Sequence, residues 1–258
     1  MGNKKETNRY TINAVDKALD LLELLAEKPM NLLEIVERLN QPKSSVYRLI
    51  TTFEDRGYIN RVDGDGKYCL GLKTLELTKN LLEDNTLLKV ARSEMEKLAN
   101  NTGESVNLGI ISGEHILYVD VIEGSHPLKF AEKVGTTGPI HCTAIGKVIA
   151  SQLSEKELKN LLDKIKFTKK TPNTIDSKDK FIEELQRIKK KGYALDDEEI
   201  VTGARCIAAP IFNMFGNVKA AISISGAAHR ISDDNLENLS SQVIEAANNI
   251  SKLLGNEK

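Results

Sequence analysis

The stretch PKSSVYRLITTFEDRGYI, residues 42–59, decides the fold of the first part of this chain. Its apolar side chains follow the i, i+3, i+4, i+7 spacing of one buried helix face, at Val46, Leu49, Ile50 and Phe53. Pro42 suits the first turn of a helix, and Gly57 suits the position just beyond its end. We therefore predict a helix from Pro42 to about Arg56.

Two more helices are predicted before this one. The first carries an apolar stripe at helical spacing and ends before Pro29; the stripe consists of Val15, Ala18, Leu19, Leu22, Leu25 and Ala26. The second begins after Asn31, a good N-cap residue, and Glu34 three positions later completes a variant of the capping box. The short break Asn40–Pro42 then separates the second helix from the third.

Two short strand-like runs, residues 58–62 and 67–70, flank the turn sequence DGDG at residues 63–66. Asp-Gly pairs between such runs are a strong hairpin signal. The order helix, helix, turn, helix, hairpin predicts a winged helix-turn-helix over residues 12–72. We expect a flexible leader at residues 1–11 and a linker helix at residues 73–86.

The outward face of the third helix is polar and has no acidic residue before Glu54. Its hydroxyl, amine and guanidinium groups suit base edges and phosphates, and they come from Lys43, Ser44, Ser45, Tyr47, Arg48, Thr51 and Thr52. We predict that this face reads double-stranded DNA. In the hairpin, Arg61 and Lys67 are either contacts to the DNA backbone or minor groove, or simply solvated charges.

Residues 87–258 predict a larger domain in which helices alternate with strands. Helical patterns cover residues 87–101, 143–152, 154–164, 178–191 and 232–254. Strand-like runs cover residues 105–111, 115–123, 193–195, 206–212 and 218–225. This mixture predicts an α+β sheet domain. The whole chain is therefore predicted to be a two-domain α+β protein.

Composition narrows the function classes. The chain has 258 residues, with 40% hydrophobic and 28% charged residues and a net charge of −1, so a DNA role depends on local placement and not on bulk charge. No apolar run is long enough to cross a membrane, and residues 1–11 lack a secretory signal, so we expect a cytoplasmic protein. The cysteines Cys69, Cys142 and Cys206 lie far apart, which argues against disulfides and a zinc site.

No catalytic residue, metal or cofactor is predicted. Gly146-Lys147 fails the P-loop pattern, because His141 and Val148 occupy the positions that need glycine and Ser or Thr. His141 and Cys142 are sequence neighbours whose side chains would point apart in an extended stretch, which is unsuitable for a thiol nucleophile and its base. The alternative that stays open is a small-molecule-binding or catalytic domain whose helix-turn-helix serves only protein interaction.

In these segments the chain resembles the IclR family of bacterial regulators. The resemblance is carried by AVDKALDLLELLA (14–26), PKSSVYRLITTFEDRGYI (42–59), YCLGLKTLEL (68–77), VGTTGPIHCTAIGKVIAS (134–151), GYALDDEEIVTGARCIAAPIF (192–212) and AAISISGAAHRI (220–231). It implies a winged-helix domain, a linker helix and a GAF-like effector-binding domain with a mixed α/β sheet. It also implies homodimers or dimers of dimers on palindromic operators, most often as repressors, and small carboxylate, sugar-acid or aromatic-acid effectors.

A pocket for such an effector is predicted from AAISISGAAHRI. In a strand, Ile222 and Ile224 face one side, while Ser223 and Ser225 face the other and suit a polar cavity, as their family counterparts do. The alternative is a solvated serine face. The helix start near Thr143 offers free N–H groups to a carboxylate, although Thr143 is also explained as a simple cap.

The resemblance adds further pocket residues. It places the acid group of the effector near Ala144 and Ile145, and it singles out Asp196 and Cys206 as lining residues. By pattern alone, the four acids 196–199 are typical of a solvated turn. An ionised Asp196 would repel a carboxylate, so we expect it to accept a hydrogen bond from a ligand hydroxyl, which favours a hydroxylated acid. Phe130 is expected either to close the apolar side of the pocket or to pack in the core.

Overall fold

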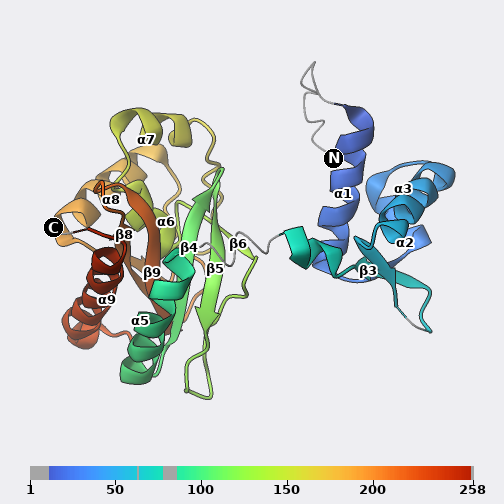
Figure 1. Ribbon diagram of the computed structural model, residues 1–258. Coiled ribbons are helices and arrows are strands. Elements are labelled where there is room, and N and C mark those ends of the chain that lie inside the picture. The colour runs from blue at the N-terminus through green and yellow to red at the C-terminus, as the bar shows by residue number, and fades with distance from the viewer. Residues whose placement is uncertain (1–11, 63, 78–85, 257–258) are drawn as a thin grey trace. The chain divides into compact units, whose positions relative to one another are not determined.

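The computed structural model describes residues 12–62, 64–77 and 86–256 (Figure 1). The chain divides into two compact units, with the boundary between residues 84 and 85. The expected leader at residues 1–11 lies outside the described residues. Within the expected linker helix, residues 73–77 are helical and residues 78–85 lie outside the described part. Each unit is therefore treated by itself.

The first unit is a winged helix-turn-helix, as predicted. Its elements are α1 (Asn13–Glu27), β1 (Met30–Asn31), α2 (Leu32–Leu39), α3 (Lys43–Asp55), β2 (Ile59–Arg61) and β3 (Lys67–Leu70). The two hairpin strands β2 and β3 pair antiparallel, and β1 adds to the other edge of β3. β1 was not predicted, because two residues are too short to show an alternating pattern.

Local capping chemistry sets the boundaries of the helices. The Asn31 side chain accepts hydrogen bonds from the backbone N–H groups of Leu33 (2.9 Å) and Glu34 (3.1 Å), and the Glu34 carboxylate accepts one from Asn31 N–H (2.8 Å). This is the predicted capping box. Asn40 ends α2 in the left-handed region, with φ 49°, and Gly57 follows α3 at φ 77°. Residues that tolerate positive φ thus make the two tight breaks around α3.

The core of this unit confirms the buried face of α3 but corrects that of α1. Val46 and Ile50 are fully buried, and Leu49 and Phe53 pack against them while partly buried. In α1, however, Val15 and Leu19 are about half exposed, and the buried residues are Leu21 and Leu25. The helix has apolar side chains on more than one face, and periodicity alone could not show which face meets α2 and β3.

The second unit is built on one antiparallel sheet of six strands in the order β6-β5-β4-β9-β8-β7. The strands are β4 (Ser105–Ser112), β5 (His115–Ile122), β6 (Thr137–Pro139), β7 (Ala194–Asp197), β8 (Ala204–Phe212) and β9 (Val218–Ala227). The helices are α5 (Thr86–Thr102), α6 (Ala144–Ala150), α7 (Glu155–Leu162), α8 (Lys178–Lys191) and α9 (Asp233–Leu253). All of these except β6 were predicted as elements of the α+β domain.

The sheet separates two hydrophobic cores, with α5 and α9 on one face and α6 to α8 on the other (Figure 1). Strand β9 contributes to both, because successive side chains of a strand point to opposite faces. Ile222 and Ile224 lie in the core under α5 and α9. Ala221 lies in the opposite core, and Ser223 and Ser225 face that same side. The alternation predicted for this strand is confirmed.

Candidate functional site

A cavity of about 330 Å³ opens on the face of the sheet that carries Ser223 and Ser225. A volume near 300 Å³ is at the small end of ligand pockets and suits a small metabolite. Segments far apart in the sequence meet around it: the loop of residues 129–132, the start of α6, the segment from Asp196 to Val201, and strands β5, β8 and β9.

The eight side chains predicted for an effector site all line this one cavity. They are Phe130, Thr143, Ala144, Ile145, Asp196, Cys206, Ser223 and Ser225. Phe130 lies in the cavity wall and not in either core cluster of the unit. Their convergence shows that the residues share a site; that the site takes an effector stays a prediction.

The sheet holds the two serines in place through a side chain that sequence reasoning missed. Asn107 of β4 is 1% exposed, and its amide nitrogen donates to the hydroxyl oxygens of Ser225 (3.0 Å) and Ser223 (3.4 Å). A hydroxyl that accepts a hydrogen bond still has its own hydrogen to donate. The serines therefore keep donors available to a ligand. The signal was the polar residue at an inward position of the apolar run 105–111.

Asp196 is a buried acidic group in the lining of the cavity. It is 4% exposed, and its Oδ1 accepts a hydrogen bond from Glu199 N–H at 2.8 Å. Burial raises the pKa of Asp196 to about 7, while the nearby Lys147 charge acts in the opposite direction. Near neutral pH the Asp196 carboxyl therefore exists in two forms: an ionised form, which only accepts hydrogen bonds, and a protonated form, which can also donate one.

The interpretation of residues 196–199 as a solvated turn is wrong. Glu199 is 5% exposed and pairs with Lys147, and Asp197 pairs with Arg205 at 2.5 Å. Four acids in sequence are tolerated because the buried Asp196 and Glu199 have a hydrogen-bond donor and an ion-pair partner, while Asp197 stays partly exposed beside Arg205. Sequence spacing carried no information about those partners.

The raised pKa of Asp196 predicts a specific pH dependence of stability. The folded protein holds a proton up to about pH 7 that an ordinary aspartate, with a pKa of 3.8, has released. The free energy of unfolding therefore falls as pH rises through this window. Asp196→Asn cannot ionise and keeps an acceptor oxygen, so it should melt at a higher temperature than the wild type at about pH 8. Calorimetry at about pH 3, below the ordinary aspartate pKa of 3.8, should find the two nearly equal; a difference independent of pH would contradict the assignment.

The start of α6 lines the cavity but is already capped. Thr143 Oγ accepts from Gly146 N–H at 3.1 Å and donates to the Pro139 carbonyl at 2.7 Å. The capping alternative for Thr143 is therefore confirmed alongside its place in the cavity wall. Gly146 is packed so closely on the Ile140 backbone that an added Cβ would lie 2.4 Å from the carbonyl oxygen. α6 is thus pressed onto the preceding strand segment, which fixes the adjacent wall.

Four polar lining residues were not found from the sequence: Tyr118, Lys129, Glu132 and Thr137. Tyr118 of β5 is mostly buried, and burial raises the pKa of its phenol. Lys129 and Glu132 lie on the loop at the mouth, where Lys129 bonds Glu123 at 2.5 Å. Tyr118 was hidden in an ordinary strand pattern, and the loop residues follow no periodicity at all.

The candidate DNA-reading face is exposed as the buried stripe requires. On α3, Lys43, Ser44, Ser45, Tyr47, Arg48 and Thr52 are exposed, and Thr51 is half-buried. Within the part of the chain that the structure describes, Lys43 and Arg48 have no carboxylate partner. The Thr52 hydroxyl donates to the Arg48 carbonyl at 2.7 Å, which leaves its oxygen as an acceptor.

The wing residues are engaged with neighbouring side chains of the same unit. Arg61 makes two hydrogen bonds to the Glu54 carboxylate, at 2.7 and 3.3 Å, and lies over the ring of Tyr68 at 5.5 Å. Lys67 lies 3.5 Å from Asp65. Both alternatives stated for Arg61 and Lys67 stay open, and a phosphate contact by Arg61 requires exchange with Glu54.

Comparison with known proteins covers both units. The model described as bacterial transcriptional regulator IclR C-terminal matches residues 79–252, and the IclR helix-turn-helix domain matches residues 14–63. The chain belongs to the IclR family. It is 33% identical over 246 residues to the HTH-type transcriptional regulator KdgR of Dickeya chrysanthemi, covering 95% of this chain and 81% of that protein.

Two further relatives of this IclR-family chain agree. The transcriptional repressor IclR of Escherichia coli K12 is 30% identical, over 95% of this chain and 90% of its own length. The crystal structure of Thermotoga maritima IclR superposes with a TM-score of 0.76 at 32% identity, over 95% of this chain and all of that one. The protein is thus a transcription regulator, with a helix-turn-helix unit followed by a mixed α/β unit.

Two further observations concern membrane-spanning helices and metal sites. In the residues that the structure describes, no helix of this IclR-family protein is long and apolar enough to cross a membrane. The same described residues include no group of three or more His, Cys, Asp or Glu side chains placed to hold a metal ion.

Proposed function

We propose that this protein is a DNA-binding repressor of a catabolic operon, and that a small hydroxylated carboxylate in the cavity controls its operator affinity. The observation that carries the proposal is the convergence of the eight predicted residues on one small cavity with polar walls. The name of the Escherichia coli relative, a transcriptional repressor, supports the sign of regulation. The protein acts on a palindromic operator as a dimer or a dimer of dimers, in the cytoplasm, without cofactor or catalysis.

The chemistry of the cavity supports a hydroxylated acid. The hydroxyls of Ser223 and Ser225 supply donors for a carboxylate, and Asp196 accepts from, or donates to, a ligand oxygen. Phe130 and Ile145 provide an apolar side for a short carbon skeleton. A volume of about 330 Å³ leaves little space for a large aromatic acid.

A thermal-shift screen of the purified full chain tests the effector class. The panel contains a sugar acid such as gluconate, a keto acid such as pyruvate, an aromatic acid such as benzoate, and the neutral sugar glucose. A ligand that binds only the folded state stabilises it by a free energy of RT ln(1 + [L]/Kd). The melting temperature therefore rises as the ligand concentration rises. We expect the sugar acid to give the largest shift. Equal shifts from glucose would contradict a carboxylate site.

A gel shift with the promoter region of the protein's own operon tests the proposed specific binding to DNA. Specific binding that weakens with salt is expected, because phosphate contacts release counterions. The ligand from the screen should change this affinity, and a promoter fusion should give higher expression without the regulator. If no specific shift occurs at physiological salt, the helix-turn-helix serves protein interaction instead.

A further inference from the structure

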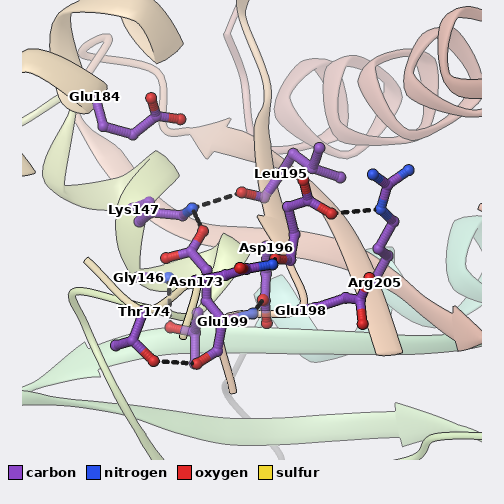
Figure 2. Close-up of polar contacts among 12 residues, drawn as sticks. Gly146, Lys147, Asn173, Thr174, Glu184, Leu195, Asp196, Glu198, Glu199 and Arg205 are labelled. Atoms are coloured by element: carbon purple, nitrogen blue, oxygen red, sulfur yellow. Dashed lines mark hydrogen bonds and ion pairs between the residues drawn. The ribbon is translucent and has the colours of Figure 1, made fainter. Parts of the chain in front are cut away.

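Lys147 and Glu199 form a fully buried ion pair beside the cavity (Figure 2). Their side chains are 1% and 6% exposed, and Lys147 Nζ also donates to the Leu195 carbonyl. Taking two charges out of water costs several kcal/mol per ion, and well-packed apolar residues often replace such pairs without loss of stability. Stability therefore does not explain the pair. The other Glu199 oxygen, Oε2, has no hydrogen-bond partner among the described residues.

The pair connects two walls of the cavity. Lys147 belongs to α6, directly after the lining residues Thr143 to Ile145, and Glu199 lies between the lining residues Asp196 and Ile200. Neither charged side chain lines the cavity itself. Since α6 and the segment 195–201 come from distant parts of the sequence, the ion pair fixes how far apart these walls stand.

The same segment is held from its other side by the loop of residues 171–174 (Figure 2). Thr174 Oγ donates to the Glu199 carbonyl at 2.7 Å, and Thr171 Oγ donates to the Glu198 carbonyl at 2.7 Å. The Glu199 N–H in turn donates to Asp196 Oδ1 at 2.8 Å. Any shift of Glu199 is thus transmitted directly to the Asp196 carboxyl.

We propose that Lys147 and Glu199 are positioning residues of the effector cavity, whose ion pair fixes the Asp196 wall against α6 and balances the charge around Asp196, so that its carboxyl can donate a hydrogen bond to a bound anion. This inference rests on the proposed function for the identity of the bound group. When the anion enters, the Asp196 carboxyl takes a proton from solvent, and no covalent bond changes.

The titratable groups around Asp196 come from several elements. Lys147 from α6 favours its ionised form, and Glu199 disfavours it. The remaining titratable neighbours are Cys142, Cys206 and Tyr118, each of which burial keeps neutral by raising its pKa. Glu132 from the mouth loop and Glu184 from α8 act at longer range, on Tyr118 and Cys206 and on Glu199 respectively. Lys147 and Glu199 are therefore the groups with opposite, separable effects.

Carbon-13 NMR of aspartate carboxyl groups in the ligand-free full chain tests the inference independently of any effector. The Asp196 signal is assigned by its loss in Asp196→Asn. In Lys147→Met the pKa of Asp196 should rise by about one unit or more, because a neighbouring positive charge is removed. In Glu199→Gln it should fall. Lys180→Met, which removes a surface lysine paired with Asp176, should leave it unchanged.

The two variants should shift the pKa of Asp196 in opposite directions, because each removes a charge of opposite sign. A merely structural role would not produce this result, because the effect of lost packing does not depend on the sign of the charge removed. Shifts in the same direction, or none, would overturn the proposal. If Lys147→Met does not fold, the double variant Lys147→Met/Glu199→Leu removes both charges and leaves neither buried alone. Its Asp196 should titrate near the wild-type value; a shift as large as that of a single variant overturns the proposal. A failed effector screen with these shifts intact would count against the proposed function alone.

Discussion

Replacing Arg48 with alanine is expected to weaken specific operator binding by about 10- to 100-fold. Arg48 lies on the exposed face of α3 and has no carboxylate partner within the described residues. A guanidinium that binds a guanine edge bidentately contributes about 1–3 kcal/mol of discrimination. The measurement is a gel shift at fixed physiological salt, with an operator fragment and a scrambled fragment of equal length.

The matched control is Arg187→Ala, an exposed arginine on α8 in the second unit. It should bind the operator like the wild type. The melting temperature of Arg48→Ala should also be unchanged, because the side chain packs against nothing in the core. Unchanged operator affinity in Arg48→Ala would remove this residue from the DNA interface, and an equal loss on both fragments would identify a phosphate contact instead of base reading.

The double variant Ser223→Ala/Asp196→Ala is expected to lose the effector response while keeping operator affinity. The two side chains reach the cavity from different strands, so the double variant removes two separate polar contacts to a ligand. Hydrogen bonds to a charged group contribute about 1.5–3 kcal/mol each, which together correspond to a loss of 100-fold or more in ligand affinity. The thermal shift and the ligand-dependent change in the gel shift should disappear together.

Ser240→Ala provides the control for this variant. Ser240 is as buried as Ser225, but its hydroxyl donates to the Glu237 carbonyl within α9, far from the cavity lining. It should retain the full effector response. A double variant that still responds would show that the effector binds elsewhere, and one that loses operator binding as well would show a folding defect.

The elements that sequence predicted well are those whose signal is local. The capping box at Asn31, the turn at Gly57 and the alternation of β9 each depend on residues within a few positions of one another. β1 and β6 were missed because strands of two or three residues show no period. Elements of this length exist only through the neighbouring strand that they pair with.

The candidate site was predictable only in part, for the same reason. The resemblance and the strand pattern located the eight lining residues, yet they gave no indication of Asn107 behind the serines. The burial of Glu199 was likewise hidden, because its partner Lys147 lies 52 positions away along the chain. A contact between distant residues leaves no trace in the periodicity of either segment.

Strand β9 presents Ile222 and Ile224 to the α5–α9 core and, on its other face, Ser223 and Ser225 to the cavity. The two sets can change separately, because a substitution at position 223 or 225 alters the cavity wall without changing Ile222 or Ile224. Under the proposed function, single replacements at these two positions would change which molecule the cavity binds, while the hydrophobic core of the second unit stays the same.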